Sequence, residues 1–355
     1  KEDSIAWSYE FLIDRLWIDP KKIAVTVFEW DSDAPVDEES VKLWLKAGIQ
    51  MHKISYLPKS DNWWWPAWET GPCWPDTEIF YWVWEGKLPP EWSNVKDDED
   101  NWMEIWNNVF MEYIKDKDGN FVKATQKNVD TGMWLERITT VLNWEISVYH
   151  TDVFKDIINK IVEVLGIEKH PSKRNSIRII ADHARTAVML LSDGVAPSNV
   201  EQGYILRRIM RRAIRQAYKL WFKWQFLWEL ANVVIENFKT IYPNVLENKE
   251  SILTEIDREE KQFLVTLEKW LKEFDKLLSW FQIAFERSGK KIEVIAWKKA
   301  FTLYDTYGFP LEMTVELAEE KGLRVDEEGF NKAFEEHQAK SRAWSEQKFK
   351  WWLAD

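Results

Sequence analysis

The apolar residues of this 355-residue chain change their spacing along its length, and this change limits the possible folds more than any other feature. In the first third, short runs rich in β-branched and aromatic residues predict strands. These runs lie at 22–29, 77–83 and 103–114. The DKDGN sequence at 116–120 predicts a hairpin turn after the last run, and the proline-punctuated segment 62–73 predicts a loop.

Helical spacing replaces this pattern in the second half. A strand ending near Val129 leads into a helix predicted over 135–142, and apolar residues at 177–191 and 247–287 recur with the period of amphipathic helices. The HPSK sequence within 166–173 interrupts these helices. The pattern predicts an α+β fold with a strand-rich domain followed by an all-helical one. The predicted domains are 1–168 and 169–355.

Composition excludes several classes of protein. Hydrophobic residues make up 45% and charged residues 30%, as in ordinary soluble proteins, so we expect a cytoplasmic location and no membrane span. The start, KEDSIAWSYEFL, does not have the pattern of a secretory signal. The single cysteine, Cys73, excludes an internal disulfide framework, and the five histidines have no zinc-binding spacing. A net charge of −12 argues against indiscriminate nucleic-acid binding, so any RNA contact needs a local basic patch.

One segment carries such a patch. Between Gly203 and Lys223 no acidic residue occurs, and seven cations gather on one flank of a predicted helix. They are Arg207, Arg208, Arg211, Arg212, Arg215, Lys219 and Lys223. Such a surface suits RNA phosphates, because arginine makes bidentate contacts with them. A surface helix paired with the acidic remainder of the protein explains the charge equally well, so both interpretations stay open.

Several strings of residues, taken together, resemble alanyl-tRNA synthetases, a class II family. The most specific are 176–215 and LYDTYGFP at 303–310, and the strings GPCWPDTEI, EIWNNVFM and VDTGMWLERI precede them in the family's order. The resemblance implies the later part of a class II antiparallel-sheet catalytic domain, followed by a helical tRNA-recognition domain. Motifs 1 and 2 of the class would then precede the chain, and a zinc-containing editing domain would follow its end at 341–355.

The string VDTGMWLERI at 129–138 resembles motif 3 of class II synthetases. The resemblance implies that Arg137 reaches the phosphates of ATP, that Asp130 holds the ammonium group of alanine, and that Gly132 leaves room for the ligand. Arg137 and Asp130 are therefore the candidate catalytic residues. A buried Asp–Arg pair that joins a strand to a helix is the structural alternative.

The same resemblance implies an alanine pocket lined by Asn107 and Val109 and closed by Trp64, with Glu78 near the adenylate. A small pocket excludes large side chains by sterics but rejects glycine and serine poorly, so the family needs editing. Core packing is the alternative for Val109 and Trp64. We do not expect Cys73 to act as a nucleophile, because no histidine lies near it in the sequence.

The APSN sequence at 196–199 and the QGYILRR that follows resemble the loop and helix that face the tRNA acceptor stem. By this resemblance Asn199 and Asp305 read the G·U wobble pair of tRNA(Ala), whose unpaired guanine amino group faces the shallow minor groove. Residues 200–202 depart from the Gly/Arg-rich loop that is commoner in the family. A helix N-cap at Asn199 and an ordinary turn at Asp305 are the alternatives.

The implied reaction is alanine–tRNA ligation. ATP with Mg²⁺ activates alanine to alanyl-adenylate, and the terminal adenosine of tRNA(Ala) accepts the alanyl group; zinc would belong only to the editing domain. We expect the isolated chain to activate alanine poorly or not at all. A non-catalytic RNA-binding module is the competing hypothesis, whereas an editing protein is disfavoured because the sequence has no zinc ligand set.

Tryptophan is abnormally frequent, with 25 residues against 12 glycines, and many tryptophans stand in turn-like contexts. We hypothesise that a glycine codon of the source was translated as tryptophan at some positions; a genuinely tryptophan-rich protein is the alternative. The resemblance to the family identifies these positions as Trp17, Trp30, Trp65, Trp68, Trp74, Trp134, Trp144, Trp297, Trp344, Trp351 and Trp352. Position 134 matters most, because an indole there would fill space meant for ATP.

Overall fold

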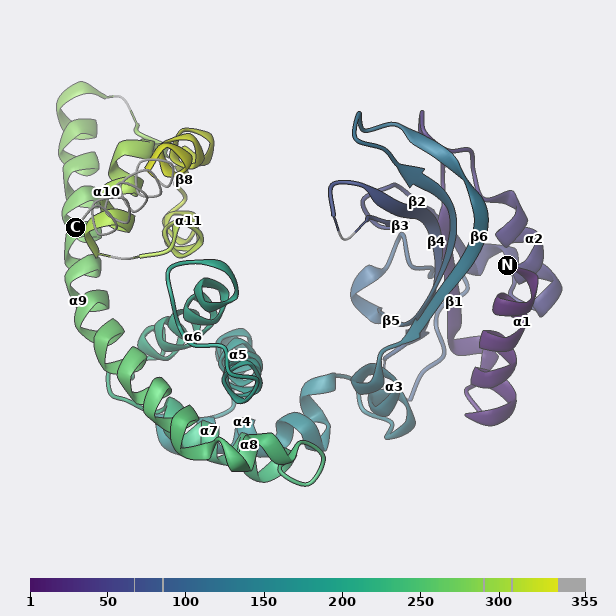
Figure 1. The fold of residues 1–355 in the computed structure, drawn as a ribbon, viewed down its shortest axis with the longest axis horizontal. Coiled ribbons are helices and arrows are strands. Elements are labelled where there is room, and N and C mark those ends of the chain that lie inside the picture. The colour runs from purple at the N-terminus through teal and green to yellow at the C-terminus, as the bar shows by residue number, and fades with distance from the viewer. Residues whose placement is uncertain (67, 85, 290, 308, 338–355) are drawn as a thin grey trace, which may run out of the picture. The chain divides into compact units, whose positions relative to one another are not determined.

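The computed structural model describes residues 1–66, 68–84, 86–289, 291–307 and 309–337. The chain divides into two compact units, Lys1–Lys155 and Asp156–Asp355 (Figure 1). The segment expected to lead toward an editing domain, 341–355, lies outside the described residues, and so do Trp344, Trp351 and Trp352. Of the helices that are described, none is long and apolar enough to cross a membrane.

The first unit is built on a six-stranded sheet in the spatial order β2-β1-β4-β5-β6, with the short β3 paired to β4. Its strands are β1 (Ile23–Phe28), β2 (Ile54–Leu57), β3 (Trp63–Trp64), β4 (Gly71–Trp82), β5 (Trp102–Lys115) and β6 (Phe121–Met133). Among these described strands, β1 and β2 run parallel and the other pairings are antiparallel. The α+β fold with a mainly antiparallel sheet is therefore confirmed, and β1 and β5 lie where the apolar runs predict them.

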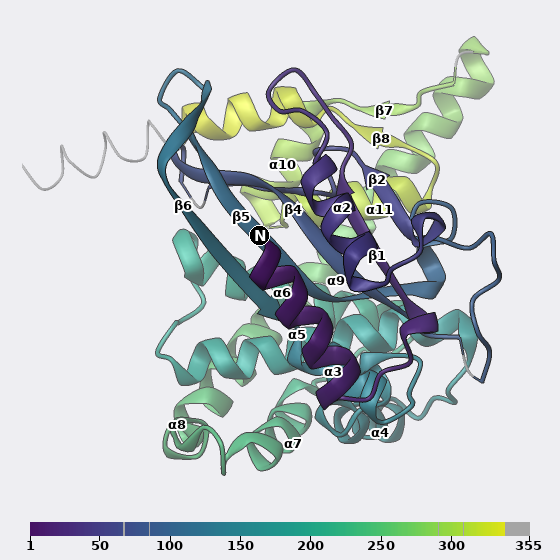
Figure 2. The ribbon, with the colours of Figure 1, turned by 90° about the vertical axis from the view of Figure 1, so that its right-hand side faces the viewer.

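Two helices cover one face of this sheet (Figure 2). They are α1 (Glu2–Glu10) and α2 (Glu38–Ala47), and their apolar residues share one core with residues of the strands. The indole of Trp44 on α2 is fully buried and donates a hydrogen bond to Thr77 Oγ1 on β4 at 2.8 Å. A third helix, α3 (Leu135–Leu142), follows β6 directly and has the predicted bounds.

Where the structure describes it, the second unit is helical apart from two short parallel strands, β7 (Val294–Ile295) and β8 (Arg324–Val325). The helix α4 (Asp152–Leu165) begins at the end of the first unit and continues into the second. The helices that follow are α5 (Arg174–Ser192), α6 (Glu201–Lys219), α7 (Leu227–Phe238), α8 (Pro243–Glu247), α9 (Lys249–Ser288), α10 (Trp297–Tyr307) and α11 (Leu311–Glu320). The 40-residue α9 packs on α5, α6 and α7. Trp270 of α9 stacks on Phe309 with ring centroids 3.7 Å apart, which fastens the start of α11 to α9.

The expectation of a loop throughout 62–73 is wrong. Trp63–Trp64 forms β3, and β4 begins already at Gly71. Prolines in this part of β4 obscure the strand in the sequence, but the register with β5 shifts between Cys73 and Asp76. Such an irregularity tolerates residues that cannot donate a ladder hydrogen bond.

The strand expected to end near Val129 continues to Met133. Asp130 and Gly132 have low intrinsic strand preference, yet both pair in register with β5. Pairing with a neighbouring strand overrides such preferences, which are weak and dependent on context. The motif 3 string therefore lies in a strand up to the turn before α3.

Backbone geometry bears on the excess of tryptophan. Among the described residues, five that are not glycine have φ in the left-handed region: Glu201 and the tryptophans Trp17, Trp30, Trp144 and Trp221. Trp144 and Trp221 follow the ends of α3 and α6 and are 80% and 85% exposed. After each of them, the next residue donates its N–H to the carbonyl five positions back at 3.0 Å. Gly166 and Gly194 close α4 and α5 with the same bond, the arrangement that favours glycine after a helix.

The other candidate positions differ from these. Trp74 is 1% exposed and packs on Tyr113 with ring centroids 4.8 Å apart, so a large side chain is accommodated there. Trp134 has φ −74°, which any residue adopts. The backbone thus supports glycine at positions 17, 30, 144 and 221. Position 221 was not identified from the resemblance to the family. At positions 74 and 134 the backbone does not distinguish glycine from tryptophan.

Candidate functional site

Three neighbouring strands bring five of the predicted site residues of the first unit to one face of the sheet. In the register of β4, β5 and β6, one row consists of Glu78, Asn107 and Gly132, and the next of Asp76, Val109 and Asp130. Directly opposed residues in an antiparallel sheet share a face, and residues two apart on a strand return to that face. Residues from three separate sequence motifs therefore lie together on one face of the β4–β5–β6 part of the sheet.

Asn107 joins two carboxylates at this place. Its Nδ2 donates to Asp76 Oδ2 at 3.1 Å and to Glu78 Oε1 at 3.2 Å. Asn62 Nδ2 donates to Asp76 Oδ1 at 3.0 Å. Asn107 Oδ1, in contrast, is buried and has no hydrogen-bond partner among the described residues. A buried acceptor of this kind, next to two carboxylates, can be satisfied by a donor on a ligand.

Burial changes the acidity of both carboxylates. Burial, with a further contribution from the nearby charges of Asp76 and Glu104, raises the pKa of Glu78 to about 9, and Arg137 offsets only part of this increase. Burial likewise raises the pKa of Asp76 to about 6, against the hydrogen bonds from Asn107 and Asn62. Near neutral pH Glu78 therefore holds a proton, and an arriving cation would favour its release. We call Asp76, Glu78 and Glu104 the carboxylate cluster.

Arg137 at the start of α3 is the cation next to this cluster. Its NH1 donates to Glu104 Oε2 at 2.6 Å and to the Glu104 carbonyl at 2.9 Å. The guanidinium carbon lies 4.7 Å from the ring centroid of Trp134, whose indole N–H donates to Glu104 Oε1 at 3.2 Å. Trp134 and Glu104 therefore hold Arg137 between them, and the predicted contact with ATP phosphates would use its Nε and NH2 donors or displace Glu104 from NH1.

The remaining predicted residues have mixed surroundings. Asp130 is exposed, so the alternative of a buried pair with Arg137 does not describe it. A Cβ at Gly132 would meet no atom within 4 Å, which leaves open space on this row. Val109 is 4% exposed and packs in the core, which is compatible with core packing and with a pocket wall, whereas Trp64 on β3 is half exposed. Burial raises the pKa of the Cys73 thiol, which disfavours the reactive thiolate.

Sequence reasoning missed three members of this arrangement. Asp76 and Glu104 belong to the carboxylate cluster, and Asn62 supports Asp76. A signal for Asp76 exists, since it stands two residues before Glu78 on a strand and so shares its face. Asn62 comes from a segment expected to be a loop, and only the fold brings it to β4.

In the second unit, the loop before α6 is seated on Gly203. The Ser198 N–H donates to the Gly203 carbonyl at 3.1 Å. A Cβ at position 203 would lie 2.3 Å from Ser198 Oγ and 2.4 Å from the Ala196 carbonyl oxygen, so the loop can approach only a glycine. The loop presents Asn199, an exposed residue, just ahead of the helix.

Asn199 and Asp305 do not follow their structural alternatives. The N-cap position of α6 is Val200, and the Asn199 Oδ1 accepts a hydrogen bond from Arg207 NH1 instead. Asp305 lies within α10 rather than in a turn, and its half-exposed carboxylate is 3.6 Å from His337 Nε2. Both side chains are open to solvent in part, as contact with a partner requires.

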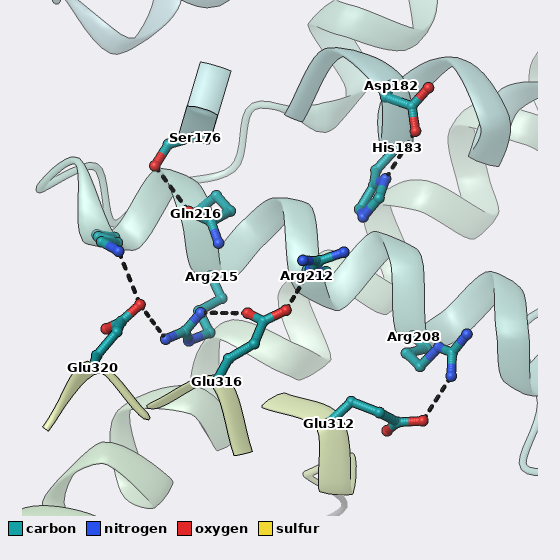
Figure 3. A network of polar contacts seen from close by, with 11 residues as sticks. Ser176, Asp182, His183, Arg208, Arg212, Arg215, Gln216, Glu312, Glu316 and Glu320 are labelled. Atoms are coloured by element: carbon teal, nitrogen blue, oxygen red, sulfur yellow. Dashed lines mark hydrogen bonds and ion pairs between the residues drawn. The ribbon is translucent and has the colours of Figure 1, made fainter. Parts of the chain in front are cut away.

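The cations of α6 are largely paired within the chain, as Figure 3 shows for the side toward α11. Arg208 NH1 lies 2.6 Å from Glu312 Oε1, and Arg212 Nε lies 2.6 Å from Glu316 Oε1. Arg215 contacts Glu316 at 2.8 Å and Glu320 at 3.0 Å, and Lys219 contacts Glu320 at 2.8 Å. We call this set the α6–α11 ladder. Glutamates four residues apart on α11 match cations on α6, so the second interpretation of the basic strip applies to these residues.

Two further arginines of α6 face α9. Arg211 Nε lies 2.7 Å from Glu259 Oε1, and Arg207 Nε lies 3.4 Å from Glu259 Oε2. The Glu259 carboxylate is 1% exposed. Arg211 and Arg215 are themselves buried, so neither offers its guanidinium to solvent. In the parts of the chain that the structure describes, no group of three His, Cys, Asp or Glu side chains can hold a metal ion.

The sequence was compared with protein-family models and with known proteins, and both comparisons found matches. The family model described as tRNA synthetases class II (A) matches residues 1–353. Proteins named alanine–tRNA ligase from Treponema denticola and Treponema pallidum are 47% and 43% identical over 363 aligned residues, covering all of this chain and 59% and 58% of the relatives. The protein of that name from Thermotoga maritima is 41% identical over 348 residues, covering 97% of the chain and 38% of the relative. The chain thus spans about three-fifths of the length of the Treponema proteins.

Proposed function

Since the chain belongs to the class II tRNA synthetase (A) family, we propose that it is the part of an alanine–tRNA ligase that binds alanine and ATP and recognises tRNA(Ala). In the complete reaction, the alanine carboxylate attacks the ATP α-phosphate, pyrophosphate leaves, and the terminal adenosine of the tRNA accepts the alanyl group. The first unit would carry the activation site, and the second would carry the acceptor-stem site. A cytoplasmic location accords with this role in translation.

The alanine ammonium group is the cation that the first site lacks. Even with Glu78 protonated, the carboxylates of Asp76, Glu104 and Asp130 outnumber the guanidinium of Arg137. Asn107 Oδ1 adds a buried acceptor without a partner among the described residues. An ammonium group near Asp130 and Asn107 would supply both positive charge and hydrogen-bond donors. Val109 and Trp64 would then limit the size of the side chain that enters. This excess of negative charge and acceptors is the observation that carries the proposal.

The residues present fit ATP, with one nitrogen of Arg137 already engaged by Glu104. Arg137 would bind phosphate, and Gly132 leaves space on the same face, but Glu104 and Trp134 now hold the guanidinium. Mg²⁺ needs few protein ligands when phosphates supply the others. Glu78, once deprotonated, and Glu104, once released by Arg137, would be the carboxylates that hold it. Bound ATP would supply the α-phosphate that activates the alanine carboxylate. Glycine at position 134 would remove half of the restraint on Arg137.

A binding measurement tests this assignment without relying on turnover. A non-hydrolysable sulfamoyl analogue of alanyl-adenylate is titrated calorimetrically into the protein, beside the same analogue with its amine acetylated. We expect the free amine to bind at least tenfold more tightly, and Asp130→Asn to remove that preference, because a charge-assisted bond contributes about 1.5–3 kcal/mol. Asp118→Asn in the hairpin turn is the matched control. Equal binding of the two analogues would refute the alanine site.

For the tRNA, Asn199 and Asp305 would contact the G·U pair of the acceptor stem. Arg208, Arg212 and Lys219 are the partly exposed cations of α6 that phosphates could reach in competition with α11. Arg211 and Arg215 would instead support the helix from within, because both are buried. Titration of an alanine-tRNA acceptor hairpin against its G·C variant tests this part, with loss of discrimination expected in Asn199→Ala and in Asp305→Ala.

A non-catalytic RNA-binding protein is the second candidate, and one observation favours it. The Trp134 indole lies against the Arg137 guanidinium, in space that ATP would need. Under this candidate the chain binds the hairpin but shows no alanine-dependent ATP–pyrophosphate exchange, and Trp134→Gly does not change that. Exchange that appears in Trp134→Gly would favour the ligase.

A further inference from the structure

A chain of contacts runs from the interior of the second unit to the loop that carries Asn199. It begins at Glu259 on α9, a carboxylate almost completely removed from solvent. Glu259 accepts from Arg211 at 2.7 Å, and its other oxygen is 3.4 Å from Arg207 Nε. Arg207 Nε makes no hydrogen bond within the described residues, so Glu259 acts on Arg207 as a buried ion-pair partner while its hydrogen bond goes to Arg211.

Arg207 carries the contact outward. Its NH1 donates to the side-chain oxygen of Asn199, and its NH2 donates to the Pro197 carbonyl at 3.4 Å. One guanidinium therefore touches Glu259 on α9 and two residues of the loop. Arg207 is also the least exposed of the strip's partly exposed cations, with 19% of its side chain accessible, against 37% for Arg208.

The chemistry of the two groups determines the orientation of the amide. A guanidinium has five N–H donors and no acceptor, so the Asn199 atom that faces it must be the oxygen. The Asn199 NH₂ group therefore turns away from Arg207, on an exposed residue. In this orientation Asn199 offers a partner two donors, while its oxygen is already engaged.

We propose that Arg207, anchored by Glu259, is a positioning residue that makes Asn199 a hydrogen-bond donor toward the minor groove of the acceptor stem. The proposal rests on the function proposed above and specifies how Asn199 would contact the acceptor stem. Acceptors in that groove are purine N3, pyrimidine O2 and the ribose 2′-hydroxyl. Asp305, which is acceptor-only when ionised, is then the residue suited to the guanine amino group. Arg207 contributes orientation rather than a phosphate contact.

The first test separates orientation from charge. Wild-type protein, Arg207→Met and Arg208→Met are titrated with the G·U and G·C acceptor hairpins at one fixed salt concentration. Arg207→Met is expected to reduce the G·U over G·C preference about tenfold, because the donor orientation is lost. Arg208→Met is the matched control: it is adjacent, carries the same charge and pairs with Glu312 instead of the loop. We expect it to weaken both hairpins equally, with the preference unchanged.

A second variant does not depend on the stability of Arg207→Met. Asn199→Asp keeps the bond to Arg207 and the shape of the side chain but has no donor. If Asn199 acts as a donor, Asn199→Asp loses discrimination as completely as Asn199→Ala. If the oxygen of Asn199 were the reading group, the aspartate would preserve discrimination, and the proposal would be overturned. Glu259→Gln is expected to change the preference in the same direction as Arg207→Met, by a smaller factor.

The outcomes distinguish this proposal from the function it rests on. No effect of Asn199→Ala on the G·U preference would refute the recognition model itself. A clear effect of Asn199→Ala combined with an unchanged preference in Arg207→Met would refute only the positioning role. Equal loss of preference in Arg207→Met and Arg208→Met would show that charge, not orientation, is responsible.

Discussion

The two units differ in how their charged side chains are paired. In the first, the three carboxylates of the cluster share one nearby guanidinium, and burial raises the pKa of Glu78 to about 9. In the second, four cations of α6 form ion pairs with three glutamates of α11 along the α6–α11 ladder. An unbalanced, partly buried group has electrostatic energy to gain from a ligand, whereas a balanced one has already gained it within the chain. The comparison teaches that a run of like charges in the sequence does not by itself mark a binding site.

The largest expected effect concerns Glu78 and pH. Its pKa in the folded protein is about 9 against an ordinary value of 4.5, so between those values the folded state holds a proton that the unfolded state has released. Stability therefore falls as the pH rises through this window, by at most about 1.4 kcal/mol per pH unit. Glu78→Gln removes this dependence and becomes progressively more stable than the parent protein.

Urea denaturation at a series of pH values between about 5 and 9 measures the difference. Glu112→Gln, on the same sheet and ion-paired with Lys127 at 3.3 Å, is the matched control. If the curves for Glu78→Gln and the parent stayed parallel across the series, the first site would not hold unbalanced charge, and the contrast with the ladder would disappear.

The ladder is expected to respond next most strongly. Glu316→Gln removes the anion between Arg212 and Arg215, and Arg215 is buried, so we expect a loss of about 1–3 kcal/mol in the free energy of unfolding. Glu312→Gln removes an exposed pair and should cost about 0–1 kcal/mol. Chemical denaturation of both variants compares them directly. Equal costs would mean that burial of Arg215 does not matter, and that the strip is an ordinary solvated face.

Replacing tryptophan by glycine at left-handed backbone positions is expected to change the free energy of unfolding by a smaller amount and in the stabilising direction. A non-glycine residue in this region costs about 1–2 kcal/mol, so Trp144→Gly and Trp221→Gly should each stabilise the protein by about 1 kcal/mol. Trp280→Gly, an exposed position inside α9, is the control and should destabilise by up to about 1 kcal/mol. Thermal denaturation gives all three values. A loss of stability in Trp144→Gly and Trp221→Gly would contradict the hypothesis of mistranslated glycine codons.

The smallest effect on stability is expected at position 134, where the effect on function is greatest. Trp134→Gly removes a cation–π contact worth about 0.5–1 kcal/mol and leaves Arg137 held by Glu104 alone. We expect tighter ATP binding in calorimetry than for the parent protein. Unchanged ATP affinity would show that Trp134 does not restrain Arg137.

The native residue at this position can be read by mass spectrometry. Trypsin cleaves after Lys127 and Arg137, so protein from its native source yields the peptide 128–137. A glycine mass at position 134 would mean that Arg137 is less covered in the native protein, which sharpens the first site as a ligand site. A tryptophan mass would favour the non-catalytic candidate.

Much of the fold could be predicted because it depends on local patterns. Runs rich in β-branched and aromatic residues predicted β1 and β5, and a helix was predicted at α3. Apolar residues at helical spacing predicted α5 and α9, because each buries one face against the core. The extension of β6 through Asp130 and Gly132 could not be predicted, because hydrogen bonding to β5 decided it against the preferences of those residues. Trp221 was not identified as a candidate glycine position for a similar reason, because its left-handed φ is a property of the folded helix end.

The candidate site was predicted in part. Glu78 and Asn107 were identified in the sequence, and the structure brings them within 3.2 Å of each other. Asn62 and Glu104 were not identified, because their roles arise from strand pairing and from contact with α3. The same holds for Glu259, which acts on Arg207 from 52 positions further along the chain.

By itself the sequence determined the order of elements, the composition of the two halves and the motif strings that place the chain in its family, because these depend on residue type and spacing. Only the tertiary structure decided which charges are balanced. Glu312, Glu316 and Glu320 lie about a hundred residues after the cations they neutralise, and Glu78 owes its raised pKa to burial beside other carboxylates. Coulomb energies depend on distance through space and on solvent, and neither quantity is written in the order of residues.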